Sequence, residues 1–175
     1  MGLGKSFLLS LVAFVGLNFI FTIIYYLVVG FDNLITTIQS APLMILYYLF
    51  GAVVSTPLML LEGTIIQPLF FGDLSFLVIG LGFLVSSLVA ALLAGKFAES
   101  KLQGFGGWGL TVIVSTIAIF IGTIPGLSDT LVATVNSYYG STGFEMTLLY
   151  LVLSGLINII FYGFFSLLVS KTEYY

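Results

Sequence analysis

The chain contains five apolar runs, each long enough to cross a lipid bilayer as a helix, and this pattern limits its fold more than any other feature. The runs cover residues 6–29, 42–61, 74–95, 108–125 and 144–170. A helix needs about 20 residues to cross roughly 30 Å of hydrocarbon. The runs are continuous, whereas the strands of a membrane barrel alternate apolar and polar residues. We therefore predict an all-α polytopic transmembrane helix bundle of about five spans, with six spans or a re-entrant segment as the alternatives.

Composition supports a membrane location and argues against one class of partner. Of the 175 residues, 60% are hydrophobic and 6% are charged, against roughly 25% charged residues in soluble proteins. We expect a multi-pass protein of the cell membrane in contact with membrane lipids. Its basic residues are four lysines, too few to neutralise the phosphates of a nucleic acid. We therefore expect no nucleic-acid partner.

The chain has neither cysteine nor histidine. This removes the thiolate and imidazole ligands of metals and haem, together with the commonest general base. The seven acidic residues are scattered singly, without the spacing of paired ligands. We therefore expect no catalytic residues, no cofactor and no bound metal, and we predict that the protein is not an enzyme.

The first apolar run follows a lysine, as the apolar region of a signal peptide does. It is about twice as long as such a region, and no small-residue cleavage site follows it. We expect it to be a retained first span, and residues 1–175 to form a single transmembrane domain.

Two segments between the runs are amphipathic. In 31–39 and 127–139, apolar residues recur at helical spacing with polar residues between them, which predicts two helices in the membrane interface. DNLITTIQS at 32–40 aligns without gaps with DTLVATVNS at 129–137. A duplicated unit of span, interfacial helix and span, at 6–61 and 108–170, would explain the similarity. Chance likeness between two membrane hairpins is the alternative.

The lysines bear on orientation, because they normally mark the cytoplasmic side. With five spans, the three later lysines share one side and Lys5 lies on the other, which puts the N-terminus outside and inverts the two halves. If 34–72 instead forms two crossings or a re-entrant pair, all four lysines share one side and the halves are parallel. That arrangement takes Glu62 into the membrane, where a lone charge costs at least about 2.5 kcal/mol. We favour five spans.

Small residues four apart mark one face of the third run. They form two adjacent ladders, Ser86, Ala90 and Ala94 beside Ser87, Ala91 and Gly95. Such residues let helix backbones approach closely, so we predict that this face is a helix-packing interface. The partner helix belongs either to this chain or to another subunit.

Four polar residues lie where a transporter would place a binding site. Asn18 and Asn158 are amides in otherwise apolar runs, and each needs a hydrogen-bond partner. Glu62 and Gln67 lie between the second and third runs, and broken helices with polar groups build the binding sites of many transporters. The simpler alternatives are that the amides bond neighbouring helices and that 62–73 is an external loop.

These observations leave two functions. The first is a non-catalytic accessory subunit, whose small-residue face packs against other integral membrane subunits of a larger complex. The second is a transport component, such as a membrane-embedded solute-binding subunit or a small pore. The second gains support if Asn18, Glu62, Gln67 and Asn158 converge on one internal cavity.

Overall fold

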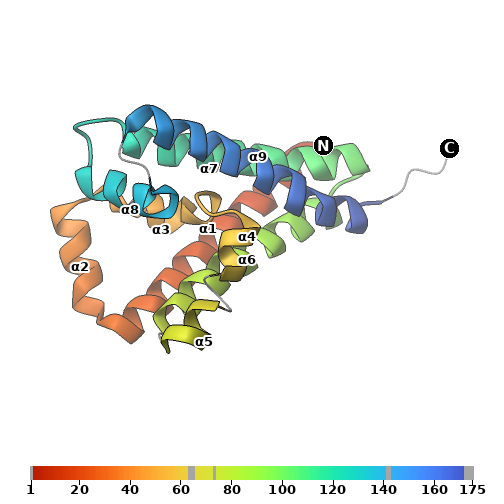
Figure 1. Ribbon diagram of the computed structural model, residues 1–175. Helices are drawn as coiled ribbons and strands as arrows, with labels where there is room; N and C mark the ends of the chain where they lie inside the picture. Colours follow the sequence, from red (N-terminus) through yellow and green to blue (C-terminus); the bar gives the residue numbers. More distant parts are fainter. Residues whose placement is uncertain (1, 63–65, 73, 141–142, 172–175) are drawn as a thin grey trace.

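The computed structural model describes residues 2–62, 66–72, 74–140 and 143–171, and the regular elements in these ranges are helices (Figure 1). In chain order they are α1 (Gly2–Val29), α2 (Phe31–Ser40), α3 (Met44–Phe50), the 3₁₀ turn η1 (Gly51–Val53), α4 (Pro57–Leu61), α5 (Gln67–Phe71), α6 (Leu74–Lys96), α7 (Lys101–Thr123), α8 (Asp129–Tyr139) and α9 (Phe144–Val169).

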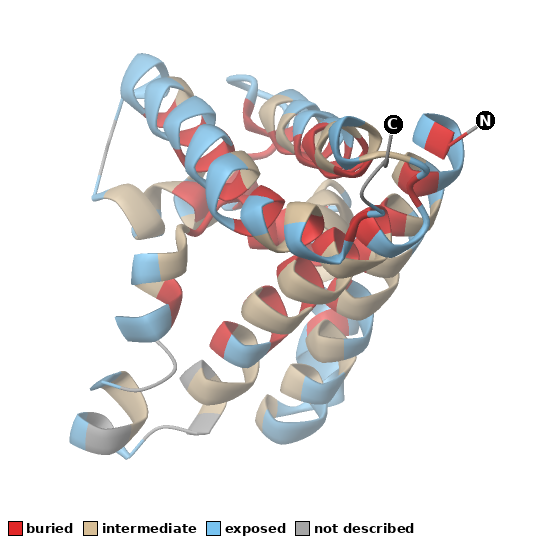
Figure 2. Ribbon diagram, turned by 90° about the vertical axis from the view of Figure 1, so that its right-hand side faces the viewer, coloured by how far each residue is buried: buried red, intermediate tan, exposed pale blue. Residues whose placement is uncertain are grey.

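Four helices of the described chain, α1, α6, α7 and α9, are long and apolar enough to cross a membrane. They correspond to four of the five apolar runs and confirm a helical membrane bundle. Figure 2 shows buried residues on their inner faces and exposed residues on their outer faces. The outer faces carry large apolar side chains such as Leu8, Val12 and Ile160. Apolar side chains of this size face lipid at little cost, so the chain is a multi-pass membrane protein.

The second predicted span differs from the prediction, because it is a broken helix. α3 gives way to η1 at Gly51, and an extended residue, Thr56, precedes α4. Pro57 explains the break: it lacks a backbone N–H and disfavours helical geometry at the residue before it. Thr56 then caps α4, since its side chain accepts a hydrogen bond from the backbone N–H of Met59 at 3.4 Å.

The broken segment enters the bundle and turns back. Tyr48 of α3 lies beside Thr22 near the end of α1. Ala52 reaches Asn18 deeper along α1, and the chain then returns to the start of α6, which runs antiparallel to α1 and brings Gly82 against Phe21. Residues 44–62 therefore form a re-entrant segment instead of a crossing, which is the alternative that the sequence left open.

The re-entrant path places all four lysines at one end of the bundle. The ammonium of Lys5 lies over the ring of Phe97, 5.4 Å from its centroid. The start of α1 and the end of α9 also lie on one side (Figure 1). We call this end, which carries Lys5, Lys96, Lys101 and Lys171, the lysine end. The favoured orientation, with Lys5 opposite the other lysines, is therefore replaced, because it counted 42–61 as a crossing.

The two amphipathic segments form helices, α2 and α8, at the opposite end. Leu34 and Leu131, which occupy the same position in the aligned nonapeptides, are both buried and belong to one apolar cluster with Met44 and Tyr48. α1 and α7 both run away from the lysine end, since Ser6 lies beside Gln103 at their starts. The two halves thus run in parallel; their duplication and the interfacial depth of α2 and α8 remain predictions.

Candidate functional site

The backbone around the helix break is held by side chains from three other helices. Ser154 of α9 donates to the carbonyls of Val53 at 2.9 Å and Val54 at 3.0 Å. Asn158 donates through Nδ2 to the carbonyls of Val53 at 3.2 Å and Ser55 at 3.0 Å. A buried carbonyl without a donor costs about 1–3 kcal/mol, so these side chains make the break possible inside the bundle.

Two further side chains complete this arrangement. The hydroxyl of Tyr139 in α8 donates to the carbonyl of Val54 at 2.6 Å. Oδ1 of Asn18 in α1 accepts from the backbone N–H of Ala52 at 3.3 Å, while its Nδ2 donates to the carbonyl of Phe14 at 2.8 Å. We call Asn18, Tyr139, Ser154 and Asn158 the polar anchor of the break.

The indole of Trp108 supports the anchor from α7. Its Nε1–H donates to the carbonyl of Asn158 at 3.0 Å, and its ring lies edge-on between Phe14, at 6.0 Å, and Tyr162, at 5.9 Å. Trp108 is fully buried. This buried position was not predicted from the sequence. The indole holds the turn of α9 that carries Asn158.

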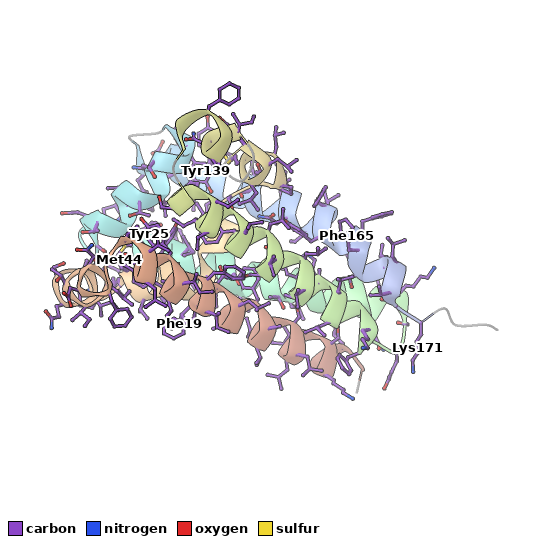
Figure 3. The ribbon with its side chains drawn as sticks, turned by 90° about the horizontal axis from the view of Figure 1, so that it is seen from below. Phe19, Tyr25, Met44, Tyr139, Phe165 and Lys171 are labelled. Carbon is purple, nitrogen blue, oxygen red and sulfur yellow. The ribbon has the colours of Figure 1, made fainter. Side chains whose placement is uncertain are left out.

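A cavity of about 220 Å³ lies beside the break, between α1, α3 and α6. We call it the inner cavity. Its lining combines six aromatic rings with amide, hydroxyl and thioether groups: Asn18, Phe21, Thr22, Tyr25, Tyr26, Met44, Tyr47, Tyr48, Ile79, Phe83 and Thr134. Figure 3 shows Tyr25 and Met44 at the same end of the bundle and Phe19 on the outer side of α1. The inner cavity is therefore aromatic, weakly polar and uncharged.

A second cavity of about 580 Å³ adjoins the first. We call it the vestibule. Its further lining comes from the re-entrant segment, α5, α6 and α8, and comprises Ser55, Met59, Leu60, Glu62, Gln67, Gly80, Ser137 and Tyr138. Glu62 is exposed, and it is the one charged side chain in the described linings of the two cavities.

The two cavities share a wall of four residues, Tyr47, Ile79, Phe83 and Thr134. Tyr47 is fixed there by two contacts. Its hydroxyl lies 2.6 Å from that of Tyr138, and its ring meets the ring of Phe83 edge-on at 6.0 Å. A rotation of the Tyr47 side chain would break this hydrogen bond.

The tyrosines of α8 act as neutral groups. Burial raises the pKa of Tyr138 above its usual range, although its hydrogen bond to Tyr47 acts in the other direction. Burial likewise raises the pKa of Tyr139, opposed by a hydrogen bond to Ser154. Both hydroxyls therefore stay protonated at physiological pH and supply hydrogen bonds without charge.

The structure brings three of the four predicted polar residues to the cavities. Asn18 lines the inner cavity, and Glu62 and Gln67 line the vestibule. Asn158 lines neither cavity, but it bonds Ser55, which does. Residues 63–65 and 73 of the segment 62–73 lie outside the described residues. The four polar side chains therefore do not converge on one cavity: Asn18 and Asn158 bond the broken segment, and Glu62 and Gln67 line the vestibule.

The small-residue face of α6 lies inside the chain. Ser86, Ser87, Ala90, Ala91 and Ala94 are at most 1% exposed. A Cβ on Gly95 would collide with the carbonyl oxygen of Ser166 in α9, and the carbonyl of Ala94 accepts from Ser6 of α1 at 2.7 Å. This face therefore packs against helices of its own chain.

Sequence reasoning missed the aromatic residues of the cavities. Tyr47 and Tyr48 lie in the middle of the second apolar run, where an interfacial tyrosine belt would not place them. Their position inside an apolar run is the sequence feature that could have indicated a role in the interior of the bundle. Tyr25, Tyr26, Tyr138 and Tyr139 lie near the ends of predicted spans, where tyrosines are typical of an interfacial belt. The sequence does not show that α8 folds back against α3.

Comparisons with known proteins do not assign the chain to a group: it matches no protein-family profile, no curated protein and no solved structure. Within the described residues, no three acidic side chains come together as a candidate metal site. The functional argument therefore rests on the re-entrant segment and its two cavities.

Proposed function

We propose that the chain is a transport component, a membrane-embedded protein that binds a small solute in the inner cavity. The observation that carries this proposal is the helix break at 51–56, held by the polar anchor beside the two cavities. Membrane transporters commonly build their sites at discontinuous helices, because the unwound backbone supplies polar groups at depth. A chain with only a structural role gains nothing from a break that needs four side chains to hold it.

The size of the cavities limits the solute. The inner cavity, at about 220 Å³, is smaller than the roughly 300 Å³ at which pockets for drug-sized ligands begin. The vestibule is larger and leads to the exposed Glu62. We infer that the solute is small, enters through the vestibule and passes the wall formed by Tyr47.

The accessory-subunit function stays the second candidate. It rested on the small-residue face, which packs inside the chain and so offers no surface to a partner. What remains in its favour is the apolar outer surface of α1 and α9, which suits lipid equally well. In either function the protein works without catalysis, as a multi-pass protein of the cell membrane. Its lysine end faces the cytoplasm, in accord with the usual bias of basic residues.

One purification tests both functions. The protein is extracted in a mild detergent, co-purifying subunits are identified, and thermal unfolding is followed through Trp108, the single tryptophan, across a panel of small solutes. We expect a self-contained protein whose midpoint rises with one class of solute, since a ligand that binds only the folded state stabilises it. Stoichiometric partner subunits and no solute effect would instead favour the accessory function.

A matched pair of variants locates the site. Thr22→Val removes a hydroxyl from the lining of the inner cavity, and Thr36→Val removes one from the exposed face of α2. Each hydroxyl donates to the carbonyl four residues earlier, at 2.9 and 2.8 Å. Thr22 also reaches the carbonyl of Tyr48 at 3.4 Å, so the midpoint of each variant is compared with and without solute. We expect Thr22→Val alone to change the solute-induced midpoint shift. Equal shifts in both variants would place binding elsewhere.

A further inference from the structure

The aromatic side chains of the inner cavity form a continuous series of rings set at steep angles to one another. Tyr25 meets Tyr26 at 80°, Tyr26 meets Tyr48 at 81°, and Tyr48 meets Tyr47 at 67°. Phe83 ends the series, at 75° to Tyr47. Neighbouring centroids lie 5.1–6.3 Å apart. All five rings line the inner cavity, so a solute held there contacts aromatic rings from α1, α3 and α6, as a cation does in an aromatic cage.

Three of the four tyrosine hydroxyls in this series bond the hydroxyl of another tyrosine. Those of Tyr26 and Tyr48 lie 2.8 Å apart, and those of Tyr47 and Tyr138 lie 2.6 Å apart. Their hydrogen-bonding capacity is thereby turned toward neighbouring rings. The cavity is left with π faces and a small number of polar atoms, and π faces carry the negative part of the ring quadrupole.

The distribution of charge along the molecule points the same way. The four lysines lie at the lysine end, away from both cavities, and Glu62 lines the vestibule. Asp32, Asp129 and Glu145 begin α2, α8 and α9 at the opposite end. The one charged side chain in the described lining of the vestibule is therefore negative, and a carboxylate with no lysine at its end of the bundle attracts positively charged solutes.

From these three observations we propose that the solute is a small organic cation of the quaternary ammonium type, held against the rings of Tyr25, Tyr26, Tyr47, Tyr48 and Phe83. This rests on the proposed function and names its substrate class. An anion is disfavoured by the ring faces and by Glu62. A neutral amphipathic molecule would fit the volume but would not use the charge distribution.

The test compares three solutes of nearly equal shape and different charge. Choline carries a trimethylammonium group. tert-Butylethanol (3,3-dimethylbutan-1-ol) has a carbon in place of the nitrogen, and tert-butylacetate, meaning the 3,3-dimethylbutanoate anion, has the same apolar group on a carboxylate. Each is titrated against the full-length protein in lipid nanodiscs, with Trp108 fluorescence and thermal unfolding as readouts. We expect choline to bind at least about tenfold more tightly than tert-butylethanol, and tert-butylacetate to bind least.

Variants of Tyr25 separate the ring from its hydroxyl. Tyr25→Phe keeps the π face and should keep choline affinity within about twofold, whereas Tyr25→Leu removes it and should weaken choline about fivefold. The affinity for tert-butylethanol should change much less. Glu62→Gln should weaken choline a few-fold at low salt and little at high salt, because an exposed charge acts through a screened potential.

The outcomes distinguish this inference from the proposed function. Equal affinity for choline and tert-butylethanol, or tighter binding of tert-butylacetate, would overturn the cation assignment while leaving solute binding in place. An equal loss of choline and tert-butylethanol affinity in Tyr25→Leu would also overturn it. If no solute of any charge stabilises the folded protein, the proposed function itself is wrong.

Discussion

The lysine end and the opposite end of this bundle are built from different residues and have different interiors. At the lysine end, Gly95, Gly104 and Gly107 bring neighbouring helices so close that a Cβ at any of them would collide with Ser166, Ser170 or Ser6. At the opposite end, tyrosine and phenylalanine replace these small residues, and two cavities of about 220 and 580 Å³ lie between them. The lysine end is closely packed, whereas the opposite end combines close contacts, such as Gly82 against Phe21, with two cavities.

The difference shows how a small membrane protein can keep an open interior. Helices in lipid gain stability from close contact and hydrogen bonds, since the hydrophobic effect does not drive them together. Cavities remove such contacts. The closely packed end must therefore supply much of the contact energy that fixes α1, α6, α7 and α9, and this allows the opposite end to contain cavities.

The largest expected effect concerns which side each end faces. The chain has no cysteine, so a single introduced thiol reports one position. Lys5→Cys and Lys101→Cys should react with an impermeant maleimide from the same side of the membrane, and Glu145→Cys from the other side only. Labelling of Lys5→Cys and Lys101→Cys from opposite sides would instead support the topology with five crossings. The four lysines would then not share one end of the bundle.

Close packing at the lysine end predicts the largest change in stability. In Gly95→Ala the new methyl group meets the backbone of α9 at Ser166, which cannot rotate away as a side chain could. We expect the free energy of unfolding to fall by about 3 kcal/mol, the upper part of the range for overpacking.

Gly16→Ala is the control for this variant, because a Cβ on Gly16 meets no other atom within 4 Å. Alanine is the better helix former, so this variant should gain about 0.5–1 kcal/mol. Denaturation in mixed micelles, followed through Trp108, measures both. Similar changes in the two variants would show that the contact between α6 and α9 is looser than described.

The polar anchor should be the most sensitive part of the opposite end. Asn158→Ala leaves the carbonyl of Ser55 without its amide donor and should cost about 2 kcal/mol. Asn33→Ala removes an exposed amide that donates to the carbonyl of Val29 at 3.0 Å, and should cost less than about 0.5 kcal/mol. The same unfolding assay compares them. An Asn158→Ala protein as stable as Asn33→Ala would mean that the break does not depend on α9.

The wall between the cavities should give the smallest effect. Tyr47→Phe removes the hydrogen bond to Tyr138 and should cost about 1 kcal/mol, as should Tyr138→Phe. In a double-mutant cycle the two changes should be non-additive, because either one breaks the same bond. Additive losses would show that each tyrosine stabilises the protein through other contacts, and that their shared hydrogen bond does not hold the wall between the cavities.

The sequence predicted the long helices well, because the length of an apolar run is itself the condition for crossing a bilayer. It failed at 42–61 for a physical reason. The run contains Gly51 and Pro57, but side-chain hydropathy carries no information about whether backbone groups find partners. Partners for Val53 and Ser55 exist only because α9 supplies them from 101 and 103 residues along the chain. If the segment at 42–61 turns back at the break, Lys5 lies at the same end of the bundle as the other three lysines.

The candidate site was partly predictable. Asn18 and Asn158 stood out as amides in apolar runs, and Glu62 and Gln67 stood out beside prolines and glycines. The inner cavity was not predictable, because it depends on the approach of α3, α6 and α8, which are distant in sequence. Tyr47 and Tyr138 are in contact although 91 residues separate them in the sequence, and no local sequence pattern predicts that contact.

The polar anchor also has a consequence for how the protein is made. The carbonyl of Ser55 receives its donor from Asn158, 103 residues later. At a synthesis rate of about 5–20 residues per second, α9 leaves the ribosome about 5–20 seconds after the break has been made. Until then, residues 51–56 would carry unpaired backbone groups into hydrocarbon, at a cost of several kcal/mol each. The re-entrant segment should therefore wait at the membrane surface or within the insertion machinery, and α9 should be the element whose arrival completes insertion.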